Sequence, residues 1–324
     1  MPRQYLDQRL KLSLLRAVDA VGTNGTLVKA SAALGISQPA LTKNLHELED
    51  ILQLRLFDRH SRGVVSTAQG KVVIQGARRI LADLHRLEED LDEYVSPSRG
   101  TVALGSLPGA AAGVVLPGVL ARLRTSHPNI KVRLQQGLMT DLVPQLASGE
   151  LDLIVGRLYE PTVPDSFKRE VLWSDPMSIL ARSEHPIFSE GVTAESLHDY
   201  NLVLPSLNQR VGQEIEHLLV KLGLEPTAPL RSNADAVIRE VLCATDSISI
   251  MPRLAFLGDV LRGSLRTASL PIPVPARPAG LILPRDRMLP PAARPFVQCL
   301  RSYICEIVDR GAISSIVSGD STSI

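Results

Sequence analysis

Three polar side chains, Gln38, Thr42 and Lys43, lie in the first turns of a helix that the sequence predicts after Ser37. Amide, hydroxyl and ammonium groups of this kind hydrogen-bond to base edges and phosphates of DNA. The opposite side of the same helix is apolar, with Leu41, Leu45 and Leu48 at helical spacing. The spacing therefore predicts a helix that packs through its leucines and presents its N-terminal polar face to the major groove.

An amphipathic helix is predicted first, over 6–21 and ended by Gly22. The residues between it and the polar helix complete a helix-turn-helix pattern. Thr26 is a plausible N-cap for a helix over 27–34, and Gly35 can supply the left-handed conformation that ends it. Ser37 can cap the next helix, with Pro39 in its first turn, where a missing N–H costs nothing. The alternative interpretation is an ordinary helical hairpin inside a core.

The segment 54–70 predicts a two-stranded wing with a tight turn at Arg62-Gly63. Arg59, His60 and Arg62 near its tip could grip phosphates or enter the minor groove. Solvated turn charges are the alternative for each of them.

A long helix is predicted from the Thr67 cap to Val95. Its apolar residues recur in alternating steps of four and three, at Val73, Ala77, Ile80, Leu84, Leu87, Leu91 and Tyr94. This repeat is typical of a coiled-coil seam, which needs a partner helix, so we expect a homodimer. Packing on the chain's own body is the alternative.

Composition indicates a globular protein with several domains: 324 residues, 44% hydrophobic, net charge +1. Residues 1–66 hold nine basic and six acidic residues, which suits a specific duplex binder with few phosphate contacts. Three cysteines form neither a metal-ligand spacing nor an even disulfide set. The uncharged stretch 101–121 is interrupted by two prolines and four glycines, so we expect no membrane span. The cysteine pattern indicates a reducing compartment and the N-terminus carries charges where a signal peptide needs an apolar core, so we expect a cytoplasmic location.

Strand and helix patterns alternate beyond a predicted hinge at 96–100. Strands are expected over 101–106, 130–135 and 151–156, with helices over 111–126 and 141–148 between them. This alternation predicts a parallel, doubly wound sheet. A second set follows, starting with a strand over 172–181, and the segments 279–283 and 292–308 could return to the first sheet. Residues 311–324 are expected to fray.

The quoted segments resemble the LysR-type transcriptional regulators over nearly the whole chain. The matching signatures are Ala32-Ala33-Leu34, Ser37-Gln-Pro-Ala-Leu41, Leu48-Glu49, Leu56-Phe-Asp-Arg59, Thr67-Ala-Gln-Gly70, His127-Pro128, Gly149-Glu-Leu-Asp152 and Met251-Pro252. Regulators of sugar uptake or aromatic-acid catabolism, particularly the galactose-binding-protein regulator type, are the most similar subgroup.

The resemblance implies a mainly α winged helix-turn-helix head over 1–66 and a linker helix over 67–95 that dimerises. It also implies a periplasmic-binding-protein-like effector domain over 101–310. Its two α/β subdomains would comprise 101–160 with 272–310, and 161–271. A homotetramer on a pseudo-palindromic double-stranded DNA operator follows, and contact with RNA polymerase is left open.

Carried over by position, the family's DNA-binding residues fall on Ser37, Gln38, Pro39, Thr42, Lys43, Arg59 and Arg62. Two departures from the family pattern concern the recognition helix. Lys43 stands where many members have arginine, which replaces a bidentate contact with a point charge. Gln53 replaces a usual glycine after the helix, which implies mild strain or a different chain exit. A third departure, Ser66, replaces a usual apolar residue before the linker helix.

Ligands of open α/β sheets bind at strand C-termini. This rule places the small-molecule effector, a sugar or an organic acid, near Ser106, Leu107, Pro108, Thr140, Arg157, Pro205, Ser206, Ser247 and Ile248. In similar regulators an arginine at the place of Arg157 holds an effector carboxylate. Pairing of Arg157 with Glu160 or Asp152 is the alternative. Asp246 favours a sugar hydroxyl, so the ligand class stays open.

The sequence also bears on two other function classes, an enzyme and a solute-binding protein. An enzyme is not expected, because the sequence has no nucleophile elbow, phosphate loop or metal-spaced histidine pair, and neither a metal nor a cofactor is predicted. A solute-binding protein of a transporter would explain residues 100–310 but not the head.

Overall fold

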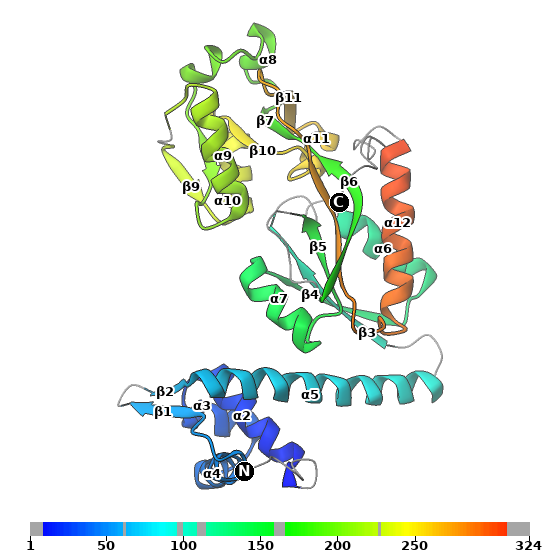
Figure 1. Cartoon of the computed structure of the whole chain (residues 1–324). Helices are drawn as coiled ribbons and strands as arrows, with labels where there is room; N and C mark the ends of the chain where they lie inside the picture. Colours follow the sequence, from blue (N-terminus) through cyan, green and yellow to red (C-terminus); the bar gives the residue numbers. More distant parts are fainter. Residues whose placement is uncertain are drawn as a thin grey trace, which may run out of the picture. The chain divides into compact units, whose positions relative to one another are not determined.

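The computed structural model describes residues 9–60, 63–95, 100–108, 115–158, 166–225 and 228–309. The chain divides into two compact units, Met1–Pro97 with Pro144–Leu151, and Ser98–Val143 with Asp152–Ile324 (Figure 1). The first unit contains the predicted head and the long helix. The second contains most of the α/β region.

Three short helices and a two-stranded sheet form the head, in the order that the sequence predicts. They are α2 (Leu12–Asn24), α3 (Leu27–Leu34), α4 (Gln38–Leu52), β1 (Phe57–His60) and β2 (Gly63–Ser66), followed by the long helix α5 (Ala68–Val95). Thr26 accepts the N–H of Lys29 at 3.3 Å, and Gly35 ends α3 with a φ of 65°. The predicted caps are confirmed at these positions, so the turn between α3 and α4 is set by local residues.

The first helix ends later than the sequence predicted. Gly22 was expected to terminate it, but α2 continues to Asn24 and ends at Gly25, whose φ is 67°. Gly22 instead allows a close approach, because a Cβ built there would lie 2.7 Å from Cδ1 of Ile74 on α5. The glycine therefore serves packing between α2 and α5 rather than helix termination.

The long helix contributes its N-terminal part to the core of the head. Ile74 and Ala77 are buried there beside α2, and Val73 packs against the same cluster. Farther along α5, Ile80, Leu87 and Leu91 are exposed, with 44%, 55% and 58% of their surface accessible. The predicted seam is thus divided: its first positions pack on the chain's own head, and its later positions stay uncovered.

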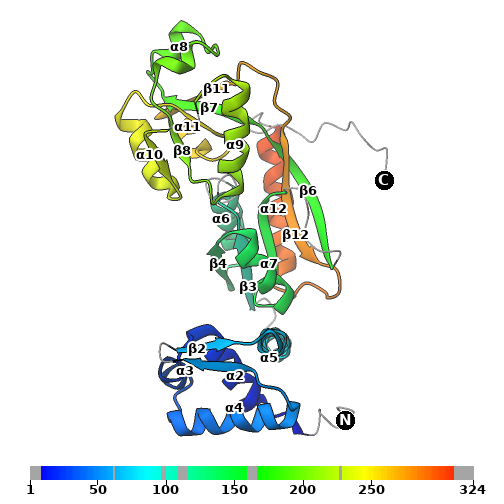
Figure 2. The ribbon, with the colours of Figure 1, turned by 60° about the vertical axis from the view of Figure 1, so that its left-hand side comes forward.

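A five-stranded sheet forms the first lobe of the second unit, with the order β4-β3-β5-β12-β6. Its strands are β3 (Gly100–Ser106), β4 (Ile130–Gln136), β5 (Leu153–Arg157), β6 (Phe167–Asp175) and β12 (Arg277–Pro284). The helices here are α6 (Leu116–Ser126), α12 (Ala293–Asp309) and the first half of α7 (Met139–Ser148), whose residues from Pro144 onward belong to the first unit. Figures 1 and 2 show α12 running beside β6, which it contacts.

The parallel arrangement that the sequence predicted holds only in part of this sheet. β3 runs parallel to β4 and β5, as expected from the helices between them. β12 is antiparallel to both β5 and β6. The chain returns from the second lobe at the opposite end of the sheet, which reverses the strand, so the sheet is mixed.

The second lobe contains the sheet β10-β7-β11 and a parallel pair of β8 and β9. Its strands are β7 (Met177–Arg182), β8 (Val203–Pro205), β9 (Leu230–Ser232), β10 (Ser249–Pro252) and β11 (Leu265–Ser269). Its helices are α8 (Ile187–Glu190), a 3-10 turn (Ser196–Asp199), α9 (Arg210–Lys221), α10 (Asp235–Ala244) and α11 (Leu257–Arg262).

The strand predicted over 172–181 is two strands in different lobes. β6 ends at Asp175 in the first sheet, and β7 begins at Met177 in the second, with Pro176 between them. Proline cannot donate a ladder hydrogen bond, so this position suits a crossing between sheets. The boundary between subdomains, predicted near 161, therefore lies at Pro176, because β6 belongs to the first lobe.

Candidate DNA-binding surface and interlobe site

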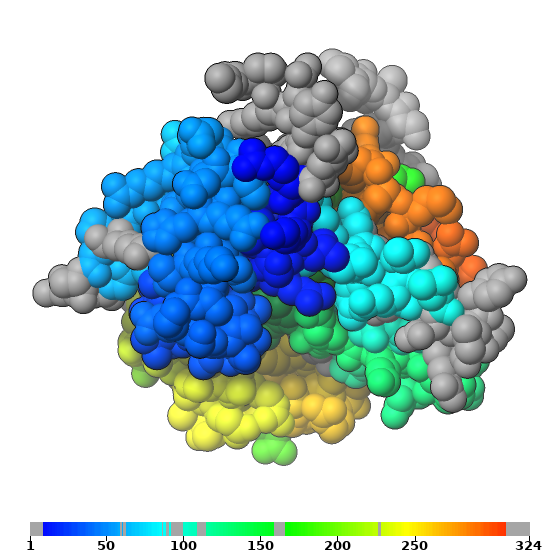
Figure 3. All heavy atoms as spheres, turned by 90° about the horizontal axis from the view of Figure 1, so that it is seen from below, coloured from blue at the N-terminus to red at the C-terminus, as the bar shows by residue number. Residues whose placement is uncertain are grey.

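The first turn of α4 presents the predicted polar residues on the surface. Ser37 accepts the N–H of Ala40 at 3.3 Å and caps the helix. Ser37, Gln38, Pro39 and Lys43 are exposed and Thr42 is half-buried, whereas Leu41, Leu45 and Leu48 lie in the core of the head. Figure 3 looks onto this side of the head, with its residues (blue) at the surface. The polar face is therefore accessible, and the alternative of a hairpin buried in a core is excluded.

Two acidic residues farther along α4 are engaged within the head. Lys11 donates a hydrogen bond to Glu47 at 2.7 Å, and this bond lowers the pKa of the Glu47 carboxyl. Oε1 of Glu49 accepts the backbone N–H of Leu56 at 2.7 Å and of Phe57 at 3.4 Å. Lys43 stands closer to the N-terminus of α4, where helix dipoles also favour anions. The N-terminal turns of α4 therefore suit an approaching phosphate backbone.

The wing is an antiparallel hairpin, as predicted, in which Arg59 pairs with Val64 and His60 with Gly63. His60 is exposed. The side chain of Arg59 and all of Arg62 lie outside the described residues. Glu49 fixes the start of β1 by accepting the N–H groups of Leu56 and Phe57, so one carboxylate links α4 to the wing.

Gln53 adopts the left-handed backbone that its place in the sequence suggested. It follows α4 with a φ of 54° and a ψ of 39° and is the one non-glycine residue with a positive φ in the described part of the chain. Its Nε2 donates to the carbonyl oxygen of Asp50 at 2.7 Å. The residue thus tolerates a conformation that costs about 1–2 kcal/mol for L-amino acids.

The carboxyl ends of the parallel strands bring several expected effector residues to one edge of the first lobe. Ser106 ends β3 beside Val155 of β5 and is fully buried. Leu107 is also buried and packs on Gly156, where an added Cβ would lie 2.6 Å away. Pro108 is half-buried and Thr140, in the first turn of α7, is exposed. Among these, Pro108 and Thr140 offer surface to a ligand.

Arg157 is bound by groups that the sequence did not suggest. Asp152 accepts the N–H of Ala103 at 2.8 Å, and Glu160 lies outside the described residues. The guanidinium of Arg157 donates instead to Glu214 through Nη1 at 3.2 Å and to the carbonyl oxygen of Asp175 through Nη2 at 3.1 Å. With 3% of its side chain exposed, Arg157 is a buried arginine bound by the protein's own groups.

Burial raises the pKa of Asp175 to about 6, against the opposing effects of Arg157 and of the Leu254 N–H. The carboxylate is fully buried, and its Oδ2 lies 3.6 Å from Nε of Arg157. Desolvation of the charged form therefore outweighs the attraction of the neighbouring arginine. Sequence reasoning missed both Asp175 and Glu214, because no local spacing links them to Arg157.

The second lobe contributes fewer accessible groups than expected. Pro205 is buried at the end of β8, and Ser206 is half-buried. The Ser247 hydroxyl lies 2.9 Å from that of Thr245. Ile248 is fully buried, and its N–H and C=O bond to Asn201 and Val203. This burial argues against direct contact between Ile248 and a ligand.

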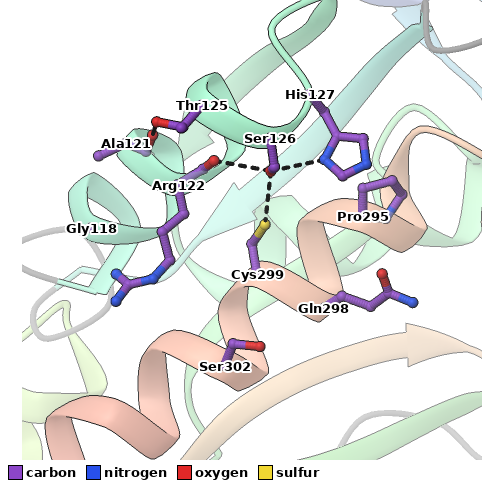
Figure 4. Close-up of a pocket in the computed structure, with 10 residues that line it drawn as sticks. All are labelled: Gly118, Ala121, Arg122, Thr125, Ser126, His127, Pro295, Gln298, Cys299 and Ser302. Carbon is purple, nitrogen blue, oxygen red and sulfur yellow. Dashed lines mark hydrogen bonds between the residues drawn. The ribbon is translucent and has the colours of Figure 1, made fainter.

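A separate pocket of about 660 Å³ lies between α6 and α12. The Ser126 hydroxyl at its centre donates to the Arg122 carbonyl oxygen at 3.0 Å and lies 2.9 Å from His127 Nδ1 and 3.8 Å from Cys299 Sγ (Figure 4). None of the expected effector residues lines this pocket.

Two family models match the chain in the positions of these two units. Residues 12–71 match the bacterial regulatory helix-turn-helix protein of the lysR family, and residues 96–304 match the LysR substrate binding domain. The chain belongs to the LysR family. It is a DNA-binding transcriptional regulator with an effector-binding domain and, like other members, is not an enzyme.

Relatives and solved structures extend this likeness over most of the chain. The regulator PcaQ of Agrobacterium fabrum is 28% identical over 94% of this chain and 98% of its own. GbpR of Azospirillum brasilense is 29% identical over 92% of this chain and 88% of its own. Full-length CbnR bound to its target DNA has a TM-score of 0.65 at 21% identity, covering 90% of this chain and 99% of that one.

Two absences hold for the residues that the structure describes. No helix among them is long and apolar enough to cross a membrane. They also contain no group of three or more histidine, cysteine or acidic side chains arranged to hold a metal ion.

Proposed function

We propose that the chain recognises a pseudo-palindromic DNA site through the N-terminal face of α4 and the wing. The contacts would come from Ser37, Gln38, Pro39, Thr42, Lys43, Arg59 and Arg62. The observation that carries this assignment is the division of α4 into a buried leucine side and an exposed polar turn. A helix anchored in this way can present polar groups to base edges without unfolding its own core.

Fluorescence anisotropy with the DNA upstream of the chain's own gene tests the assignment. Lys43→Ala and Arg59→Ala should each weaken binding by about 1–3 kcal/mol, with the unfolding of the head unchanged. Lys221→Ala removes one exposed positive charge on α9 and serves as the matched control. If the two head variants bind this DNA with the same affinity as the Lys221→Ala control, the proposed surface is refuted.

We also propose that two chains pair through α5. Leu87 and Leu91 are exposed on a helix of 28 residues, and large apolar side chains in such a row favour a partner helix. A two-fold pair would present two copies of α4 to two half-sites. Association of two pairs into a homotetramer extends the same proposal.

The effector in this proposal is a small molecule, a sugar or an organic acid, held where the strands of the two lobes end. Pro108, Thr140 and Ser206 retain accessible surface there, whereas Arg157 is occupied by Glu214 and Asp175. This occupation favours neutral hydroxyl-bearing ligands over a carboxylate bound at Arg157. Calorimetric titration of the full chain with galactose, which has hydroxyls and no carboxylate, and with benzoate, which has a carboxylate and no hydroxyl, distinguishes the two classes.

A further inference from the structure

Glu214 joins the two lobes through a shared ion pair. It lies on α9 of the second lobe, and its Oε2 accepts from Nη1 of Arg157 at 3.2 Å. Its Oε1 accepts from Nε of Arg277 at 2.9 Å. Both arginines belong to the first lobe, at the end of β5 and the start of β12, where these neighbouring strands pair. One carboxylate of one lobe therefore contacts two cations of the other.

The neighbouring residues of α9 face a different direction. Ile215, Leu218 and Leu219 are buried in the core of the second lobe. Glu216 forms its ion pair with Arg231, which lies on β9 of the same lobe. Glu214 thus reaches from α9 to the first lobe, whereas Glu216, two residues later, pairs within its own lobe.

Burial makes this contact insensitive to ordinary salt concentrations. The side chains of Arg157 and Glu214 are 3% and 11% exposed, so dissolved ions screen them little. Removing Glu214 would take one ion-pair partner from the buried guanidinium of Arg157. The contact also lies beside the crossing at Asp175, whose carbonyl oxygen binds the same arginine. It can therefore set the angle between the lobes at the point where they turn.

We propose that Glu214 is an interlobe latch, which holds the two lobes of the effector domain together before any ligand binds. The Arg157–Glu214–Arg277 contact would supply the closing interaction that a ligand supplies in an open two-lobed domain. The ligand-free domain would then rest in one closed arrangement. This inference concerns the domain without ligand and is independent of the proposed DNA surface, although it shares the Arg157–Glu214 contact with the argument for the effector class.

Distances between spin labels in the two lobes test the latch in the full chain. Arg124 on α6 and Val237 on α10 are exposed and lie in different lobes, so each is replaced by a labelled cysteine. The native cysteines are first changed to serine at Cys243, Cys299 and Cys305. Labelled chains are diluted with unlabelled chains so that pairs within one chain dominate, and no ligand is added.

In this background, the unsubstituted latch should give one narrow distance distribution. Glu214→Gln should broaden it or shift it to longer distances. Glu216→Gln removes an equivalent charge from the same helix but breaks a contact within one lobe, so it should leave the distribution unchanged. An unchanged distribution in Glu214→Gln, or the same change in both variants, would overturn the latch.

A second variant decides the question if Glu214→Gln does not fold. Arg277 has 43% of its side chain exposed, so Arg277→Gln removes half of the latch without burying an unpaired cation. Broadening in this variant supports the latch, and a distribution like that of the parent refutes it. DNA affinity of the same proteins is measured separately, so failure of the latch leaves the recognition surface untouched.

Discussion

Replacing Gln53 by glycine should stabilise the head of this regulator. Gln53 holds a left-handed backbone after α4, with a φ of 54°. This conformation costs about 1–2 kcal/mol for a residue with a Cβ. Two effects oppose the gain: glycine loses about 0.5–1 kcal/mol more backbone entropy on folding, and the bond from Nε2 to Asp50 disappears.

Gln53→Ala separates these effects, because alanine lacks the side-chain hydrogen bond but keeps the Cβ. An exposed hydrogen bond contributes about 0.5 kcal/mol, so alanine should be less stable than the parent by that amount. Glycine should exceed alanine by about 1 kcal/mol, since it alone relieves the left-handed strain. The expected order of stability, from the most to the least stable head, is therefore glycine, glutamine and alanine at position 53.

Native-state hydrogen exchange measures this order within the full chain. The buried residues Leu41, Leu45 and Leu48 of α4 exchange through opening of the head, so their amides report its free energy. A gain of 1 kcal/mol corresponds to about fivefold slower exchange. Glycine and alanine variants that exchange equally, or an alanine variant that exchanges more slowly, would refute the strain at Gln53.

Three further predictions concern the wing, the dimer and the buried carboxylate. Glu49→Ala should destabilise the attachment of the wing to α4 by about 1–3 kcal/mol, because two N–H groups lose their acceptor. DNA footprinting of this variant should show lost protection only beneath the wing. Leu87→Asp should convert the proposed dimer into monomers, as measured by analytical ultracentrifugation, and should lower the affinity for DNA. Unchanged association would contradict pairing through α5. The folded-state pKa of Asp175, about 6, exceeds its ordinary 3.8, so its contribution to stability should fall as the pH rises from about 4 to 6. Urea unfolding followed by Trp173 fluorescence should show that the free energy of unfolding of Asp175→Asn increases relative to that of the parent by up to about 3 kcal/mol across this pH range. Parallel pH profiles of the two proteins would refute the raised pKa.

The head could be predicted from sequence almost completely, because its signals are local. Thr26, Ser37 and Thr67 cap helices through N–H groups three residues away. The leucine spacing of α4 likewise defines its buried side without reference to distant residues. The error at Gly22 arose because its reason lies in Ile74, more than fifty residues along the chain.

The effector domain depended more on tertiary structure. The alternation of strands and helices predicted two α/β lobes, but not that β12 would run antiparallel or that Pro176 would divide one apolar segment between sheets. Local hydrophobicity is the same for a strand in either lobe and in either direction.

The sequence by itself determined where the helices of the head begin and which side of α4 is polar, since capping and periodicity act within a few residues. Only the tertiary structure decided the partners of Arg157. Glu214 meets it from the other lobe and also pairs with Arg277 of a neighbouring strand, and an ion pair between distant segments leaves no spacing in the sequence. The burial of Asp175 follows in the same way, because desolvation depends on every element packed around the carboxylate.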